Sequence, residues 1–185
     1  MVVRLLISAS LVLVSNFGFA STDWEKAENS IKRLSASDFP ELPLDVKRKI
    51  EAKGCNIPQA FVSQKPHNVI KGNFASNDSQ DWALLCSKNG KSTIFVIWGG
   101  KQACPSEIAA SDDKTFLQTI DEKNIGYSRV LAVSVKDEIL KHQKSYGGML
   151  PPKLDHQGIS DAFAEKASQI HFCEKGKWLA LSGAD

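Results

Sequence analysis

The sequence predicts an α+β fold in which N-terminal helices pack on a mainly antiparallel β-sheet and disulfides stabilise the domain. Helical spacing of apolar residues is concentrated near the N-terminus, whereas short apolar runs separated by turn residues dominate the middle and the end of the chain. Four cysteines form an even set. The length of 185 residues suits one domain after removal of a leader.

Residues 1–20 have the pattern of a secretory signal peptide. Arg4 precedes an apolar run over residues 5–14, and Gly18 and Ala20 place small side chains before a cleavage point at Ser21. The run is about half of the ~20 apolar residues that a membrane-spanning helix needs. We therefore expect cleavage between Ala20 and Ser21, no stable membrane anchor, and residues 21–185 as a single globular domain in the periplasm or outside the cell.

Two helices are expected first. Trp24, Ala27 and Ile31 follow helical spacing, which predicts a helix over residues 23–34. A second helix is expected over residues 44–53, and Gly54 occupies the usual place of a helix C-terminus.

The middle of the chain predicts strands at residues 69–74, 82–87 and 92–98. Asn89 and Gly90 separate the last two strands and indicate a two-residue hairpin, because both residues accept a positive φ. That turn sets the register, so Cys86 faces Thr93. Both faces of this hairpin are apolar, which predicts a place inside a sheet that is covered on both sides.

The rest of the chain mixes both kinds of element and ends in a hairpin. The expected elements are a helix over 113–123, a strand over 127–135, a helix over 137–145, a long loop over 145–158, and strands over 170–173 and 178–181.

The cysteines take their meaning from the expected compartment. Exported thiols tend to oxidise, so we expect two disulfides, and the wide cysteine spacing does not fit a zinc site. Three connectivities are open to four cysteines, and we take Cys55–Cys86 with Cys104–Cys173 as the working hypothesis.

Composition and motifs exclude several functions. Lys+Arg 23 against Asp+Glu 21 gives a net charge of +2, which argues against a nucleic-acid partner. The chain contains no H-E-x-x-H and no G-x-S-x-G sequence. A small exported hydrolase stays open as an alternative, in which His156 acts with the nearby acids Asp155 and Asp161.

Residues 72–85 combine Gly-Asn-Phe, a polar loop, an acid and an apolar strand. This stretch resembles a single FG-GAP or VCBS-type motif, a family whose loops bind calcium. The resemblance implies a hairpin with a polar loop and offers Asn73, Asn77, Asp78 and Asp81 as calcium ligands. The other interpretation is a structural turn in which Asp81 accepts backbone N–H groups. No other cofactor is expected.

Three further stretches, at residues 55–59, 81–86 and 176–178, resemble small uncharacterised bacterial exported proteins. That resemblance supports the class and the compartment. We therefore expect a non-catalytic binding protein, of the inhibitor or immunity type, whose partner is a protein or a cell-envelope ligand.

Overall fold

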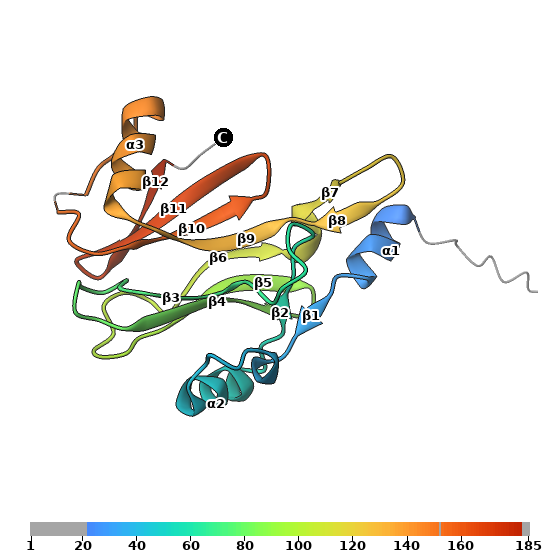
Figure 1. Cartoon of the computed structure of the whole chain (residues 1–185), viewed down its shortest axis with the longest axis horizontal. Helices are drawn as coiled ribbons and strands as arrows, with labels where there is room; N and C mark the ends of the chain where they lie inside the picture. Colours follow the sequence, from blue (N-terminus) through green and yellow to red (C-terminus); the bar gives the residue numbers. More distant parts are fainter. Residues whose placement is uncertain (1–21, 152, 183–185) are drawn as a thin grey trace, which may run out of the picture.

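The computed structural model describes residues 22–151 and 153–182, and within them two four-stranded antiparallel sheets lie one above the other (Figure 1). The lower sheet in Figure 1, named the front sheet, has the order β3-β4-β5-β6. The upper sheet, named the back sheet, has the order β12-β11-β10-β9. Two short two-stranded ladders, β1-β2 and β7-β8, complete the strand pairing. The mixed α+β class with mainly antiparallel sheets and two disulfides is therefore confirmed.

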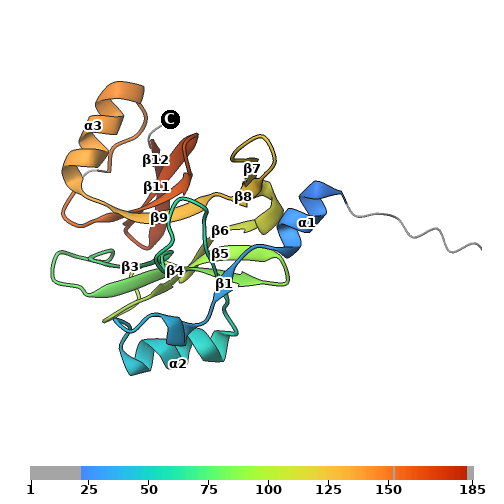
Figure 2. The same cartoon turned by 45° about the vertical axis from the view of Figure 1, so that its right-hand side comes forward.

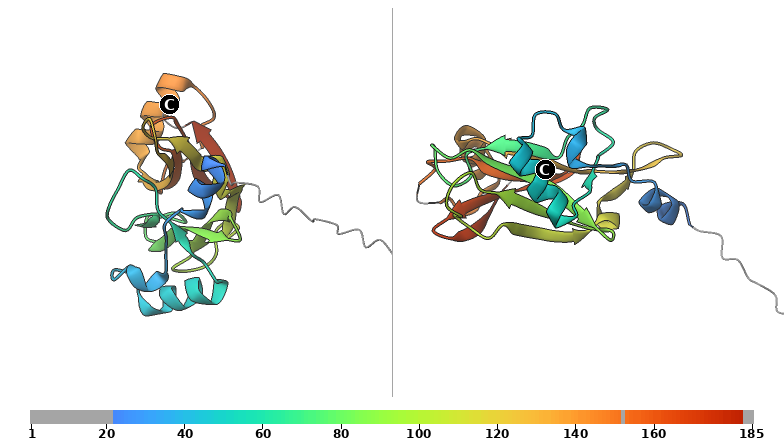
Figure 3. Two further views of the ribbon diagram at one scale, coloured as in Figure 1. Left: turned by 90° about the vertical axis from the view of Figure 1, so that its right-hand side faces the viewer. Right: turned by 90° about the horizontal axis from the view of Figure 1, so that it is seen from below.

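The helical elements are α1 (Asp23–Asn29), η1 (Ala36–Asp38), α2 (Leu44–Lys53), η2 (Asp113–Phe116) and α3 (Lys136–Tyr146). The strands are β1 (Arg33–Leu34), β2 (Ile57–Pro58), β3 (Val69–Gly72), β4 (Asp81–Lys88), β5 (Lys91–Ile97), β6 (Glu107–Asp112), β7 (Leu117–Thr119), β8 (Ile125–Tyr127), β9 (Arg129–Ser134), β10 (Gly158–Phe163), β11 (Ala167–Glu174) and β12 (Lys177–Ser182). Seen from the side, α2 and α3 lie at opposite ends of the stack, with the strands between them (Figures 2 and 3).

The central hairpin of the front sheet has the predicted register. Asn89 and Gly90 both have positive φ, and Cys86 pairs with Thr93 as expected. The inner face of β4 and β5 packs toward the back sheet with Leu85 and Ile94, both completely buried. The outer face packs beneath α2, where Leu84 meets the buried side chains of that helix. Burial on both faces explains why the hairpin is apolar on both faces.

The back sheet is covered on its outer face by α3. Ile139 of α3 packs with Ile170, Phe172 and Leu181 of the terminal hairpin. That hairpin is confirmed, with Cys173 opposite Trp178. The expected helix over 137–145 is also confirmed, one residue longer at each end.

The two disulfides join the pairs that the working hypothesis named. Cys55–Cys86 ties the end of α2 to β4. Cys104–Cys173 ties the loop that follows β5 to β11 and so links the front sheet to the back sheet. Near this second bridge, Trp98 stacks on Trp178 with ring centroids 5.9 Å apart.

The prediction of a helix over residues 113–123 is wrong. Only one 3-10 turn forms, because Asp113 is drawn into the interior, where its Oδ2 accepts from Ser87 Oγ and Arg33 Nη2. The chain then runs as β7, and Asp121 closes a turn by accepting the backbone N–H groups of Lys123 and Asn124.

Other expectations needed smaller corrections. The first helix ends at Asn29 rather than at residue 34, and the chain continues into β1. The strand expected over 127–135 is divided at Ser128 into β8 and β9. Strands β6 and β10 were not expected. No helix in the described ranges is long and apolar enough to cross a membrane.

Candidate functional site

The loop between β3 and β4 is organised by Asp81. Asp81 is completely buried, and its Oδ2 accepts from the backbone N–H of Phe74 at 2.9 Å and of Ala75 at 3.0 Å, and from Ser79 Oγ at 2.6 Å. Its Oδ1 accepts from the backbone N–H of Gly99 at 3.0 Å. The expectation that Asp81 accepts backbone N–H groups of this loop is confirmed. A carboxylate surrounded by donors is arranged to hold a turn.

The other three calcium candidates belong to the same loop, but in the described residues none of them shares a hydrogen bond with the Asp81 carboxylate. Asn73 donates through its side-chain amide to the carbonyl of Asn77, while Asn77 and Asp78 are exposed. The backbone of Asn73 is in turn tied to Gln157 by two hydrogen bonds of 2.9 Å. Within residues 22–151 and 153–182, no three His, Cys, Asp or Glu side chains are grouped as they would be to hold a metal ion.

His156 is a buried side chain of the long loop that follows α3. Its ring stacks on Phe172 at 4.0 Å between centroids, with 9° between the planes. Its Nε2 lies 2.8 Å from the carbonyl oxygen of Cys173, and its Nδ1 lies 3.0 Å from that of Gln157. Both ring nitrogens are thus engaged by backbone oxygens, so this geometry anchors the loop to the back sheet.

The two acids that sequence reasoning placed with His156 are not brought to it. Asp155 is exposed. Asp161 lies on the inner face of the back sheet with His171, whereas Phe172, on which His156 stacks, points to the outer face.

Asp161 instead forms a buried ion pair with Arg129. Arg129 is 1% exposed, and its Nε and Nη2 donate to the two carboxylate oxygens of Asp161 at 2.8 and 2.7 Å. The remaining N–H groups reach the front sheet, where they donate to the carbonyl and hydroxyl of Ser92 and to the carbonyl of Ala109. The Phe116 ring lies 4.6 Å from the guanidinium. All five donors are used, so Arg129 clamps the two sheets together.

The electrostatics of this pair follow from its surroundings. Burial alone raises the pKa of Asp161, but the hydrogen bonds and the charge of Arg129 outweigh it and leave the pKa lowered. His171 Nε2 lies 3.7 Å from Asp161 Oδ2, too far for a hydrogen bond. Because the pair is enclosed and saturated, its role is structural.

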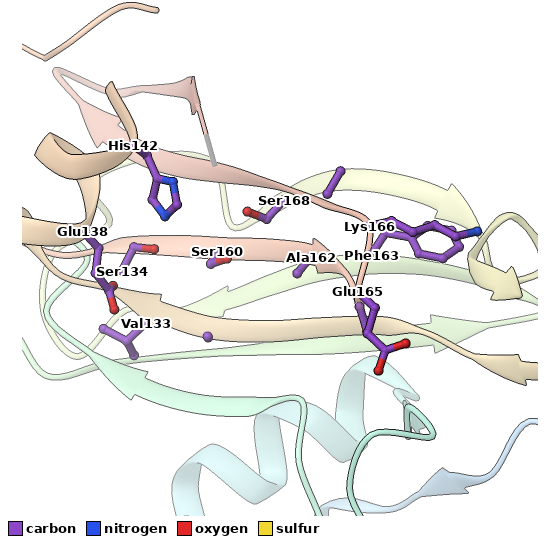
Figure 4. Close-up of a pocket in the computed structure, with 13 residues that line it drawn as sticks. Val133, Ser134, Glu138, His142, Ser160, Ala162, Phe163, Glu165, Lys166 and Ser168 are labelled. Carbon is purple, nitrogen blue, oxygen red and sulfur yellow. The ribbon is translucent and has the colours of Figure 1, made fainter. Parts of the chain in front are cut away.

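A first open hollow, the α3 groove, lies between α3 and the outer face of the back sheet (Figure 4). It has a volume of about 440 Å³. His142 extends from α3 above the strand that carries Ser160, and the floor consists of small side chains. Its charged groups, among them Glu138, Glu165 and Lys166, are of both signs. Because these charges are of both signs, the α3 groove has no strong net charge that would select a ligand.

A second open surface, the α2 groove, lies between α2 and the end of the β4–β5 hairpin that is away from its turn. It consists of two hollows of about 530 and 220 Å³ that share Lys49, Ile97 and Trp98. Its lining includes Lys49 and Lys53 of α2, Lys71 of β3, Trp82 of β4, and Phe95, Ile97 and Trp98 of the β5 segment.

The α2 groove combines ammonium groups with aromatic rings. Lys53 Nζ lies 5.3 Å from the centroid of the Phe95 ring and forms an ion pair with Glu107. Lys71 Nζ lies 5.9 Å from the centroid of Trp82. Lys49 lines both hollows, and its side chain has no hydrogen bond, ion pair or ring contact with any residue of the described chain. The groove therefore offers an unpaired positive charge beside an apolar wall.

Sequence reasoning did not identify this groove, although one signal was present. Lys49 and Lys53 are four residues apart, so a helix over residues 44–53 places both on one face. The sequence did not reveal that this face borders the edge of the apolar hairpin.

Comparison with known protein families, with the curated proteins and with the solved structures found no match to this chain. The resemblances noted for residues 72–85 and for the three shorter stretches therefore stay predictions.

Proposed function

We propose that this protein is an exported, non-catalytic binding protein, and that the α2 groove is the surface that binds a protein or cell-envelope ligand. The observation that carries the proposal is the ammonium group of Lys49, which has no partner among residues 22–151 and 153–182 and stands between two hollows lined by Ile97 and Trp98. Binding sites typically combine a mostly apolar wall with a few polar groups that fix orientation.

The rest of the molecule supports this proposal. The expected signal peptide and the two disulfides are those of an exported protein. The packing of α2 on the outer face of the front sheet supplies one wall of the groove, and the Cys55–Cys86 bridge holds the end of that helix in place. A rigid frame of this kind lowers the entropy cost of binding.

Lysine footprinting tests the proposal on the unmodified protein. The mature chain is treated briefly with an acetylating reagent, alone and in the presence of an envelope extract from its host. Mass spectrometry then gives the acetylation rate of each lysine. We expect the extract to slow acetylation of Lys49 and Lys71 and to leave that of Lys123, an exposed residue of the β7–β8 turn, unchanged.

Equal rates for Lys49 with and without extract would contradict the proposal. Protection confined to Lys166 would move the binding surface to the α3 groove. A Lys49→Glu variant supplies the matched check, because reversing an exposed charge should abolish retention of the extract component while leaving the melting temperature within a few degrees of the parent.

The two alternative functions predict other readouts. A hydrolase would turn over an ester or cell-wall substrate and lose that activity in His156→Gln at a temperature where the variant is folded. A calcium-dependent module would gain thermal stability when calcium is added. Neither readout is expected of a binding protein that acts through the α2 groove.

A further inference from the structure

We infer that the α2 groove takes a ligand in which a carboxylate is joined to an apolar chain, with Lys49 binding the carboxylate. This inference rests on the proposed function and specifies the chemistry of its ligand. It follows from the size of the groove, the division of its lining into apolar and charged parts, and the pairing state of its lysines.

The larger hollow has the size and wall of a small-molecule site. Its volume of about 530 Å³ lies within the usual range of ligand pockets, roughly 300–1,000 Å³. Phe95 and Ile97 point to the outer face of the front sheet and form the apolar wall of the hollow, whereas Val96 and Trp98 turn inward to the core between the sheets. Burying an alkyl chain against this wall is favourable at about 0.8 kcal/mol per methylene.

The positive charge beside the larger hollow determines which charged group of a ligand would bind there. Lys53 is already paired with Glu107, which leaves Lys49 as the unpaired ammonium of this hollow within the described residues. A lysine is a point charge without the fork geometry that matches a phosphate in two hydrogen bonds. One free ammonium balances one negative charge, so a single carboxylate fits better than a doubly charged phosphate.

The smaller hollow also places charged side chains beside apolar ones. Lys71 and Asp45 both line it, and Lys49 stands between it and the larger hollow. The charges of Asp45 and Lys71 offset each other and Glu107 offsets Lys53, so the net positive charge of the groove is centred on Lys49. A carboxylate at Lys49 would leave the apolar tail free to lie along Ile97 toward Phe95.

Decanoate and decan-1-ol are the probes that test this inference, because they share a ten-carbon chain and differ in the head group. Each is titrated into the mature protein below its micelle concentration. Tryptophan fluorescence reports binding, since Trp82 and Trp98 line the groove. Decanoate should bind up to about fivefold more tightly than decan-1-ol, the gain expected of an exposed ion pair.

Three variants isolate the role of Lys49. In Lys49→Gln the advantage of decanoate over decan-1-ol should disappear, while decan-1-ol binds as before. In Lys49→Arg the advantage should persist. Lys47→Gln removes a charge from the same helix outside either hollow and should leave both affinities unchanged.

The inference is overturned if the two probes bind equally to the parent protein, if the advantage survives in Lys49→Gln, or if neither probe binds. Those outcomes are distinct from failure of the proposed function. If only the ligand class is wrong, the envelope extract will still protect Lys49 from acetylation. If the groove is not a binding surface, that protection will be absent as well.

Discussion

Replacing Asp81 with alanine removes the acceptor of four hydrogen bonds at the point where the 73–81 loop enters β4. Phe74 is completely buried, so water cannot replace the carboxylate as the acceptor for its backbone N–H. Leaving this N–H without a hydrogen bond costs about 1–3 kcal/mol. Ala75 is half-buried and Gly99 is exposed, so water partly replaces the carboxylate there and each loss costs about 0.5–1 kcal/mol. The variant should therefore lose about 2–5 kcal/mol of the free energy of unfolding.

Urea unfolding of the oxidised mature protein measures this loss. The midpoint should fall while the slope stays constant, because the same surface is exposed on unfolding. Asp78→Ala, at an exposed position of the same loop, is the matched control and should change stability by less than about 0.5 kcal/mol. Asp81→Asn preserves the side-chain size, so any loss in that variant reports the hydrogen bonds rather than a cavity.

A chelator separates the structural role of Asp81 from a calcium role. If the carboxylate only holds the turn, the loss in Asp81→Ala is the same with and without chelator. If chelator alone lowers the midpoint of the parent protein, and Asp81→Ala abolishes that response, the structural explanation is refuted and the loop is a calcium site.

Three further outcomes follow from the structure. Arg129→Met leaves Asp161 buried without its partner, so a urea titration should show a loss of about 3–5 kcal/mol. Because the folded-state pKa of Asp161 is lowered, its stabilising contribution is complete above the unfolded value of about 3.9 and is lost as the pH falls through the folded-state pKa; acid titration of Asp161→Asn should lack this component. Thiol titration of the denatured, unreduced protein should find no free cysteine, and reduction of either disulfide should cost about 2–5 kcal/mol.

Cleavage of the leader is tested separately. Intact-mass analysis of the exported protein should give a chain that begins at Ser21, as the pattern over residues 1–20 predicts. A mass that includes residues 1–20 would contradict the prediction. This cleavage point lies outside the described residues.

The elements that the sequence predicts well are those governed by neighbouring residues. Asn89 and Gly90 set a two-residue turn, and the turn sets the register of β4 and β5 over seven residue pairs. The helix over residues 44–53 has the predicted ends, because Gly54 takes the left-handed conformation that stops it. Asp81 likewise acts on residues at most seven positions away for three of its four hydrogen bonds.

The elements that the sequence does not predict depend on distant partners. The helix expected over residues 113–123 does not form, because Asp113 is buried in a hydrogen bond with Arg33, a residue 80 positions away in the sequence. The burial of Arg129 also depends on distant partners, because Asp161, Ser92 and Ala109 come from three other strands. No local pattern distinguishes a buried arginine of this kind from an exposed one in a strand.

The candidate sites also divide into those set by nearby residues and those set by distant contacts. The two disulfides and the polar loop at Asp81 could be predicted from residue types and short spacings, because those signals depend on residue type or act within a few residues. The separation of His156 from Asp161 arises from strand alternation, which places consecutive residues of β11 on opposite faces of the back sheet. The α2 groove exists only because α2 packs across one end of the front sheet and leaves Lys49 beside Ile97 and Trp98, a contact between segments about fifty residues apart that only the tertiary structure creates.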